Sequence, residues 1–407
     1  MTVDRCARKE TMTHYDTIVI GGGAAGMMAA ITAKRQGASV LVCEKMPKIG
    51  KKLLITGAGR CNLLNKILDD SFYNPESQVL VRSILGQFGK DAMLGFFKEL
   101  GLATYADETG RIFPVTNQAA SVLKMLEMEL ERLKVTLDLG CEIKNIRVTK
   151  SGFEISAKSG ERETGRKVIL CVGGRSYPAL GADGNGYALA AAFGHRVVEP
   201  VPSTVPLLVK DPWCHALQGQ KIRAAATGRI QGKETRTAFG ELLFTQYGLS
   251  GTAILDVSDE ISIALNRDHK ASVSVVVDLI PFMDEKELTV ELSQKLTKGI
   301  AREDLVEGLL PHKFCNALRE TLQGCDVAVV ARLLKHKEFK VIGTRGWNEA
   351  EFTAGGIPAE EVDPLTLESK LQKGLYFAGE VLDVQGRRGG YNLAWAWASG
   401  AVAGKTA

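Results

Sequence analysis

The sequence carries little net charge and no long apolar run. Its 51 Lys and Arg residues against 47 Asp and Glu residues leave a formal charge of +4, and no dense basic segment with interleaved aromatic residues points to nucleic acid. The apolar runs stay below the roughly 18 residues of a membrane-spanning helix, and the first 15 residues lack the apolar core of a signal peptide. We therefore expect a cytoplasmic protein that acts on a small molecule, without a membrane or nucleic-acid partner. The oligomeric state stays open.

Cysteine is also sparse, with eight residues scattered along 407. These cysteines form no CxxC pair and no zinc-ligand spacing, so we expect no metal site. Several lie in apolar runs, such as Cys43 and Cys171, where a thiol packs like a small hydrophobic side chain. This usage is typical of a reducing compartment, and a chain of this length can bury its core without cross-links.

A glycine-rich turn near the N-terminus predicts a dinucleotide site. The β-branched run 17–20 predicts a buried strand, residues 24–36 a helix of small residues, and residues 39–43 a second strand closed by Glu44. In the intervening Gly-x-Gly-x-x-Gly motif, the three glycines permit a tight turn, a close pyrophosphate and close helix packing, respectively. The helix N-terminus offers N–H groups to phosphates, and the acid can bind ribose hydroxyls. The expected contacts are Gly21, Gly23, Ala24, Ala25, Gly26, Glu44 and Lys45.

A second strand-to-helix turn near the C-terminus favours FAD over NAD, because a long cofactor needs two anchors. An apolar strand at 374–378 runs into a glycine and an acid, and a glycine pair then opens the helix 393–402. The acid can bind ribityl hydroxyls, and the helix N-terminus can face the flavin pyrimidine, where charge accumulates on reduction. A helix that only packs on the core is the alternative, but it needs no glycine pair at its start. The expected contacts are Gly379, Glu380, Asp383, Gly389, Gly390, Tyr391, Asn392 and Leu393.

Two further segments are expected to contact the cofactor. Residues 51–62 combine glycines with polar side chains, although a basic surface turn is the alternative, and the apolar strand 168–172 ends in a glycine pair. Cys61 has no local partner thiol for dithiol chemistry, so we expect it to pack or to touch the flavin. The expected contacts are Lys52, Thr56, Gly57, Gly59, Arg60, Cys61, Asn62, Gly173 and Gly174.

The order of strand and helix signals predicts an α/β protein. We expect a Rossmann-like FAD-binding domain over 1–194 and 354–407, with 1–14 as a loose extension. Short strand-like pieces alternating with turns predict a small β-barrel over 195–280 and 337–353, and a helical insert covers 281–336. The loop 181–186 is glycine-rich, but it lacks a βαβ unit and a ribose-binding acid, so we expect no separate NAD domain.

Five stretches resemble the YhiN/BaiN-like flavoproteins: LLITGAGRCN, GRIFPVTNQA, ILCVGGRSYPALGADGNGYALAAAFGH, FTQYGLSGTAIL and LYFAGEVLDVQGRRGGYNLAWAWASGAVAG. The resemblance covers nearly all of the chain beyond residue 15. It implies a glutathione-reductase-type FAD domain with an inserted β-barrel and a helical insert. It also implies FAD contacts at positions matching Gly21–Gly26, Glu44, Thr56–Asn62, Gly173 and Gly379–Leu393. Two places depart from the family. Gln246 and Thr252 stand where His and Pro are expected, and Leu63–Asn65 replaces a more polar run.

This family includes aminoacetone oxidases and a 3-dehydro-bile acid Δ4,6-reductase. The resemblance implies NAD(P)H-dependent reduction of an activated C=C bond through FAD, with NAD(P)H as co-substrate and a 3-oxo-Δ4 or Δ4,6 bile acid intermediate as candidate substrate. One alternative is an oxidase of a small amine such as aminoacetone. Another is a flavin-bound RNA-associated or redox-sensing protein, against which the weak basic charge and the lack of an evident dithiol argue. No motif assigns a catalytic acid.

Overall fold

The computed structural model describes residues 13–268 and 270–407, and the chain divides into two units. The first unit runs to Pro200 and resumes at Thr353, while the second comprises Val201–Phe352. Most of the expected N-terminal extension, residues 1–12, lies outside the described residues. The first strand already begins at His14. Both ends of the described chain therefore contribute to one unit.

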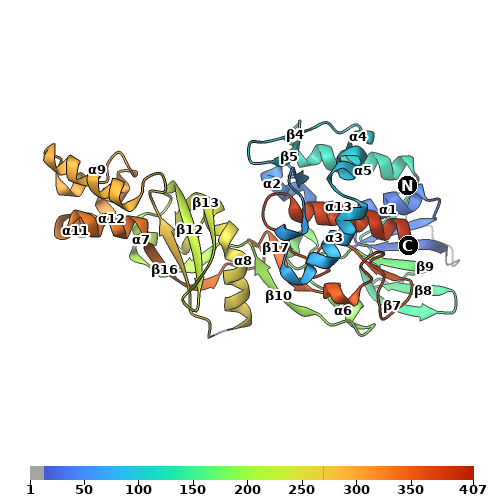
Figure 1. The fold of residues 1–407 in the computed structure, drawn as a ribbon. Helices are drawn as coiled ribbons and strands as arrows, with labels where there is room; N and C mark the ends of the chain where they lie inside the picture. The colour runs from blue at the N-terminus through green and yellow to red at the C-terminus, as the bar shows by residue number, and fades with distance from the viewer. Residues whose placement is uncertain (1–12, 269) are drawn as a thin grey trace. The chain divides into compact units, whose positions relative to one another are not determined.

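A seven-stranded sheet forms the centre of the first unit (Figure 1). Five strands pair in parallel, and two extend the sheet as an antiparallel meander. The inner strands are apolar on both faces because both faces are covered, and the whole run Ile18–Ile20 is buried. The strands are β1 (His14–Ile20), β2 (Val40–Glu44), β6 (Thr136–Leu139), β7 (Ile143–Thr149), β8 (Gly152–Ala157), β9 (Arg162–Leu170) and β18 (Leu375–Phe377).

Two helices of small residues, α1 (Ala24–Arg35) and α13 (Tyr391–Thr406), pack against each other in this unit. A Cβ atom on Gly400 would lie 2.4 Å from the Ala25 carbonyl oxygen, and one on Gly404 would lie 2.3 Å from that of Ala29. The two backbones therefore approach at a distance that only glycine permits. The other elements are α2 (Thr56–Gly59), β3 (Leu64–Asn65), α3 (Gln78–Gln87), α4 (Lys90–Glu99), β4 (Thr104–Ala106), β5 (Arg111–Pro114), α5 (Ala119–Arg132) and α6 (Tyr187–Ala191), with β10 (Val198–Ser203) and β17 (Phe352–Gly356) paired at the unit boundary.

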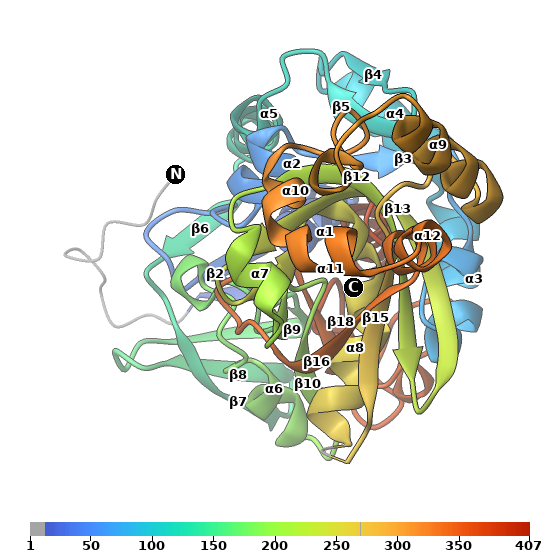
Figure 2. The same ribbon diagram turned by 90° about the vertical axis from the view of Figure 1, so that its left-hand side faces the viewer.

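The second unit contains a closed six-stranded barrel and a group of helices (Figure 2). Its barrel strands are β11 (Leu207–Val209), β12 (Lys221–Ile230), β13 (Lys233–Thr245), β14 (Gly248–Ser250), β15 (Val273–Asp278) and β16 (Lys337–Thr344). The helices are α7 (Pro212–Ala216), α8 (Thr252–Arg267), α9 (Glu285–Thr297), α10 (Lys313–Ala317), α11 (Arg319–Gly324) and α12 (Val327–Lys335). Phe244 of β13 packs edge-on against Phe339 of β16 and Phe314 of α10, with ring centroids 6.2 and 5.8 Å away. Barrel and helices therefore share one core.

The sequence-based expectation of strands and turns throughout 195–280 is wrong at α8. Ile254, Val257 and Ile261 lie on one face of this 16-residue helix and are buried, at the spacing of an amphipathic helix. The helix begins close to β13, because a Cβ on Gly240 would lie 2.3 Å from the Thr252 hydroxyl oxygen. Neither α8 nor any other helix among the described residues is long and apolar enough to cross a membrane.

Candidate cofactor site

A cavity in the first unit opens where β1, β2 and β9 end. Parallel sheets bind their ligands at this carboxyl edge. The wall combines backbone at the strand ends with side chains from loops distant in sequence. It is lined by Ile20, Gly21, Gly23, Cys43–Met46, Lys48, Gly50–Lys52, Cys141–Ile143, Cys171–Gly173, Leu180–Ala182, Asn185, Gly186, Leu189 and Glu380.

The turn between β1 and α1 leaves room beside its backbone. Gly21 has a φ of +105°, and a Cβ there would lie 2.4 Å from the Cys171 carbonyl oxygen. A Cβ on Gly26 would lie 1.9 Å from the Gly21 carbonyl oxygen. Gly23 differs, because a Cβ there meets no atom within 4 Å, and this N-cap residue of α1 makes no side-chain cap. The helix N-terminus therefore presents uncapped N–H groups to open space, which is the cradle that a pyrophosphate needs.

Two backbone N–H groups hold the carboxylate of Glu44, the last residue of β2, in place. One carboxylate oxygen, Oε2, accepts the Gly22 N–H at 2.7 Å, and Oε1 accepts the Met46 N–H at 2.7 Å. Each oxygen keeps acceptor capacity for a further donor, and Glu44 lines the cavity. A fixed carboxylate at this strand end can bind the two hydroxyls of a ribose.

Glu380 enters the same cavity from the opposite end of the chain. Its Oε2 pairs with the Lys52 ammonium at 2.8 Å, and its Oε1 accepts the Thr353 N–H at 2.8 Å and the Ser176 hydroxyl at 3.2 Å. Lys52 also donates to Ser176 Oγ at 2.5 Å. Asp383 has a different role, because its Oδ1 accepts the Gly355 N–H at 2.9 Å and the residue is outside the cavity lining. Of the two expected acids, Glu380 is the one that reaches the site.

The loop 181–186 forms part of the wall of this same cavity. Asp183 pairs with Lys45 at 2.6 Å and accepts the Asn185 N–H at 3.1 Å. Burial alone would raise the pKa of Asp183, but the hydrogen bonds and charge of these partners outweigh it and hold the pKa below its usual range. The ion pair ties the loop to the residue after Glu44. The loop thus belongs to the same candidate cofactor cavity as Glu44.

The segment Thr56–Asn62 lies outside the cavity lining. The Thr56 hydroxyl donates to the Leu53 carbonyl at 2.7 Å, and the Arg60 guanidinium sits 4.6 Å from the centroid of the Phe113 ring. Burial raises the pKa of the Cys61 thiol to about 12, which leaves it protonated and unsuited to nucleophilic chemistry. The Asn62 side-chain oxygen is buried and has no hydrogen-bond partner among the described residues, so it is an acceptor that a cofactor N–H could satisfy.

The start of α13 is built from close contacts. Gly390 has a φ of +100°, and a Cβ there would lie 2.6 Å from the backbone of Leu64. Tyr391 stacks on Phe72 with centroids 4.4 Å apart, and the Asn392 amide exchanges hydrogen bonds with the backbone of Gly386 at 2.9 and 2.6 Å. The residues of this group outside the cavity lining are Gly379, Asp383, Gly389, Gly390, Tyr391, Asn392 and Leu393.

Residues 15–406 of the chain match the family described as HI0933-like protein Rossmann domain. The chain belongs to this family. The resemblance to YhiN/BaiN-like flavoproteins and the Rossmann-type α/β fold class are thereby confirmed.

Relatives of this HI0933-like chain match it almost from end to end. It is 38% identical to the 3-dehydro-bile acid Δ(4,6)-reductase of Clostridium scindens, over 96% of this chain and 98% of that protein. It is 31% identical to a ribosomal RNA dihydrouridine synthase of Escherichia coli, over 95% of this chain and 96% of that protein. Among solved structures, a quinol-fumarate reductase matches 97% of this chain and 70% of its own with a TM-score of 0.52 and 17% identity. That likeness concerns the fold.

The HI0933-like chain is a flavoprotein oxidoreductase, and the residues of its cavity fit FAD. The open space at Gly23 suits the pyrophosphate, Glu44 suits the adenosine ribose, and Glu380 is a second fixed acid for hydroxyls further along the cofactor. Of the sequence-predicted contacts, the structure brings Gly21, Gly23, Glu44, Lys45, Lys52, Gly173 and Glu380 into one cavity lining. Gly174 lies just behind, since a Cβ there would be 3.0 Å from the Glu380 carboxyl carbon. Ala24, Ala25 and Gly26 are outside this lining and form the first turn of α1.

Sequence reasoning missed two parts of the wall. The first part is Cys141–Ile143, directly after β6. The second part comprises Leu180–Ala182 and Leu189, in and beside the loop 181–186, which was considered from the sequence only as a candidate for a separate NAD domain. The signal for the first was its position directly after a parallel strand beside β2. The second carried no local signal, because long-range contacts such as the Lys45–Asp183 ion pair bring the loop to the end of β2.

Proposed function

We propose that this chain reduces a C=C bond conjugated with a carbonyl group, with NAD(P)H as electron donor and a 3-oxo-Δ4 or Δ4,6 bile acid intermediate as substrate. The observation that carries the proposal is the 38% identity to the Clostridium scindens bile acid reductase over 96% of the chain. At this identity and coverage the fold and the cofactor frame are shared, whereas a substrate pocket can still differ.

The names of the full-length relatives support one type of reaction on two types of substrate. A 3-oxo-Δ4,6 steroid carries C=C bonds conjugated with its ketone. A dihydrouridine is a uridine whose C5=C6 bond, conjugated with the C4 carbonyl, has gained two hydrogens. Each reduction adds a hydride to an electron-poor end of the conjugated system, the β-carbon or, for the Δ6 bond of the steroid, the δ-carbon, and a proton completes the saturated bond. We infer that this chemistry extends to the present chain.

Several groups of the first unit would hold and orient the cofactor. When bound, FAD accepts a hydride from a donor and passes it to the substrate. The uncapped N–H groups at the start of α1 would bind phosphate oxygens, and Glu44 would orient the adenosine ribose. Lys52, Ser176 and the Thr353 N–H fix the Glu380 carboxylate in its place at the cavity. The N-terminus of the 16-residue helix α13 carries a partial positive charge that would stabilise negative charge on a reduced flavin held beside it.

An anaerobic half-reaction experiment tests the proposal. The purified yellow protein is mixed in turn with NADH, NADPH and aminoacetone, and flavin absorbance is followed. We expect a reduced nicotinamide to bleach the flavin and a 3-oxo-Δ4 steroid to restore its colour, with a product two hydrogens heavier by mass spectrometry. The matched saturated 3-oxo steroid should leave the flavin bleached. Bleaching by aminoacetone and not by NAD(P)H would overturn the reductase in favour of the amine oxidase.

A second candidate function is the reduction of uridine in ribosomal RNA. It is supported by the 31% identity to dihydrouridine synthases of Escherichia coli and Haemophilus influenzae, each over 95% of this chain. The near-neutral charge that argues against a nucleic-acid partner is a property of the whole chain, and a basic patch on one face is compatible with it. Ribosomal RNA lacking the modification, incubated with the protein and NADPH and analysed for dihydrouridine, separates this candidate from the steroid reductase.

A further inference from the structure

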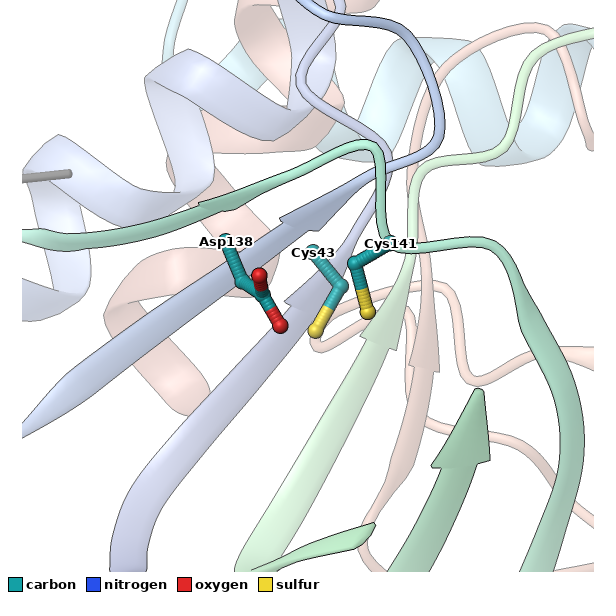
Figure 3. A group of neighbouring side chains, drawn as sticks. All are labelled: Cys43, Asp138 and Cys141. Atoms are coloured by element: carbon teal, nitrogen blue, oxygen red, sulfur yellow. The ribbon is translucent and has the colours of Figure 1, made fainter. Parts of the chain in front are cut away.

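Two cysteines and an aspartate meet beside the cofactor cavity, although Cys43 lies far from Asp138 and Cys141 in the sequence. Cys43 is on β2, Asp138 is its register partner on the parallel strand β6, and Cys141 lies in the turn after β6 (Figure 3). The Cys141 N–H donates to the Glu44 carbonyl at 2.9 Å, which fixes the turn against β2. Strand pairing therefore assembles a group that no sequence spacing reveals.

The three side chains are close enough to share one ion. The two sulfur atoms and a carboxylate oxygen lie within 4.8 Å of one another, and the residues are only 1%, 4% and 4% exposed. In a tetrahedral zinc site, Zn–S bonds of about 2.3 Å set the two sulfurs about 3.8 Å apart. Closing the group around an ion therefore takes a movement of about 1 Å at most, which small side-chain rotations supply.

The surroundings favour a cation over a neutral disulfide. Asp138 and Glu163 both place negative charge near the Cys43 thiol. A divalent cation can take thiolate and carboxylate ligands together, whereas a disulfide joins only the two sulfurs.

A second group in the described residues serves as a contrast. Glu307, His312 and Cys315 also lie within 4.8 Å of one another, in the second unit. There the Glu307 carboxylate already accepts hydrogen bonds from His312 at 2.8 Å and from Cys315 at 3.4 Å, and the His312 side chain is 69% exposed. Its polar side chains already bond one another, so it supplies a matched control.

We propose that Cys43, Asp138 and Cys141 form a binding site for a thiophilic divalent cation such as Zn²⁺. On binding, two S–H bonds break and their protons pass to solvent, while two metal–sulfur bonds and one metal–oxygen bond form without any change of oxidation state. A bound ion would tie the turn at Cys141, which lines the cavity, to the strand that carries Glu44. Composition and spacing predicted no metal site because the ligands come from two strands that only the fold brings together.

Cadmium binding to the FAD-bound protein tests the site. The holoprotein is stripped with a chelator, dialysed and titrated with Cd²⁺, and metal per chain is measured together with the thiolate-to-cadmium absorption in the ultraviolet. We expect one tightly bound ion per chain with a thiolate band. Cys43→Ala and Cys141→Ala should abolish both, and Asp138→Asn should weaken binding by about 10- to 100-fold, the range for a lost supporting group. Cys315→Ala should bind as the wild type does.

Controls keep each outcome decisive. The FAD content and metal-free melting temperature of every variant show whether it folds, and if Cys43→Ala does not, Cys141→Ala and Asp138→Asn carry the test. Loss of the band in Cys315→Ala with retention in Cys43→Ala would move the ion to the second unit and overturn the proposal. So would a holoprotein that takes up no ion, or one in which mass spectrometry finds Cys43 and Cys141 joined as a disulfide in place of metal.

Discussion

Replacing Gly23 by valine should separate cofactor binding from folding. A Cβ at this position meets no atom within 4 Å, and the φ of −79° is accessible to any residue. The apoprotein should therefore keep its stability to within about 0.5 kcal/mol, as for a surface substitution. The branched side chain would fill the space in front of the α1 N-terminus, where the pyrophosphate is proposed to lie.

The expected loss of FAD affinity follows from the contacts displaced. One charge-assisted hydrogen bond contributes about 1.5–3 kcal/mol, and the helix dipole contributes about 0.3–2 kcal/mol. Losing both weakens binding by about 2–5 kcal/mol, or from about 30-fold to a few thousandfold. Flavin fluorescence titration of the apoprotein measures the affinity, and a thermal melt without FAD measures the fold.

Gly26→Ala is the matched control for this experiment. A Cβ there would lie 1.9 Å from the Gly21 carbonyl oxygen, so this smaller substitution should destabilise the apoprotein itself. The reasoning is refuted if Gly23→Val binds FAD as the wild type does, because the phosphates would then lie elsewhere. It is equally refuted if Gly23→Val lowers the apoprotein melting temperature as much as Gly26→Ala does.

Three other substitutions or treatments have defined outcomes. Glu44→Ala should weaken FAD binding by about 1–3 kcal/mol in the same titration. Unlike Gly23→Val, it should also lower the apoprotein melting temperature, because the Gly22 and Met46 N–H groups lose their acceptor. Gly404→Val should destabilise the protein in a denaturant melt by more than the roughly 1–3 kcal/mol typical of overpacking, since even a Cβ would lie 2.3 Å from the Ala29 carbonyl oxygen. The control Gly86→Ala should not destabilise the protein in this way, because a Cβ there meets no described atom within 4 Å. Cys61, buried and with its pKa raised to about 12, should react with iodoacetamide at pH 8 far more slowly than the half-buried Cys325, as peptide mass mapping would reveal.

Local pattern was enough to predict the frame of the first unit. The β1–α1–β2 segment carries its own periodicity, glycine spacing and closing acid, so its elements fall where the sequence places them. The helix α8 was missed because it lies among short strands, and its apolar spacing was overlooked in a region read as barrel. The cavity wall at Cys141 depends on the pairing of β2 with β6. The wall formed by the loop of Asp183 depends on an ion pair with Lys45, 138 residues away in the sequence. Such long-range contacts leave no periodic trace in the chain.

Gln246 and Thr252, which depart from the family pattern, both lie in the second unit. Thr252 is the first residue of α8, after the N-cap Gly251, and proline is favoured at that position of a helix. In this chain the Thr252 hydroxyl instead accepts the Glu241 N–H at 2.8 Å, so proline and threonine are two ways of starting the same helix. This residue therefore acts on the scaffold of the second unit, and nothing in its contacts favours one substrate over another. Gln246 lies in the turn between β13 and β14, where a side chain can change without disturbing the barrel ladder. The exchange at Gln246 is therefore expected to leave folding unchanged, whereas the exchange at Thr252 changes how a helix begins.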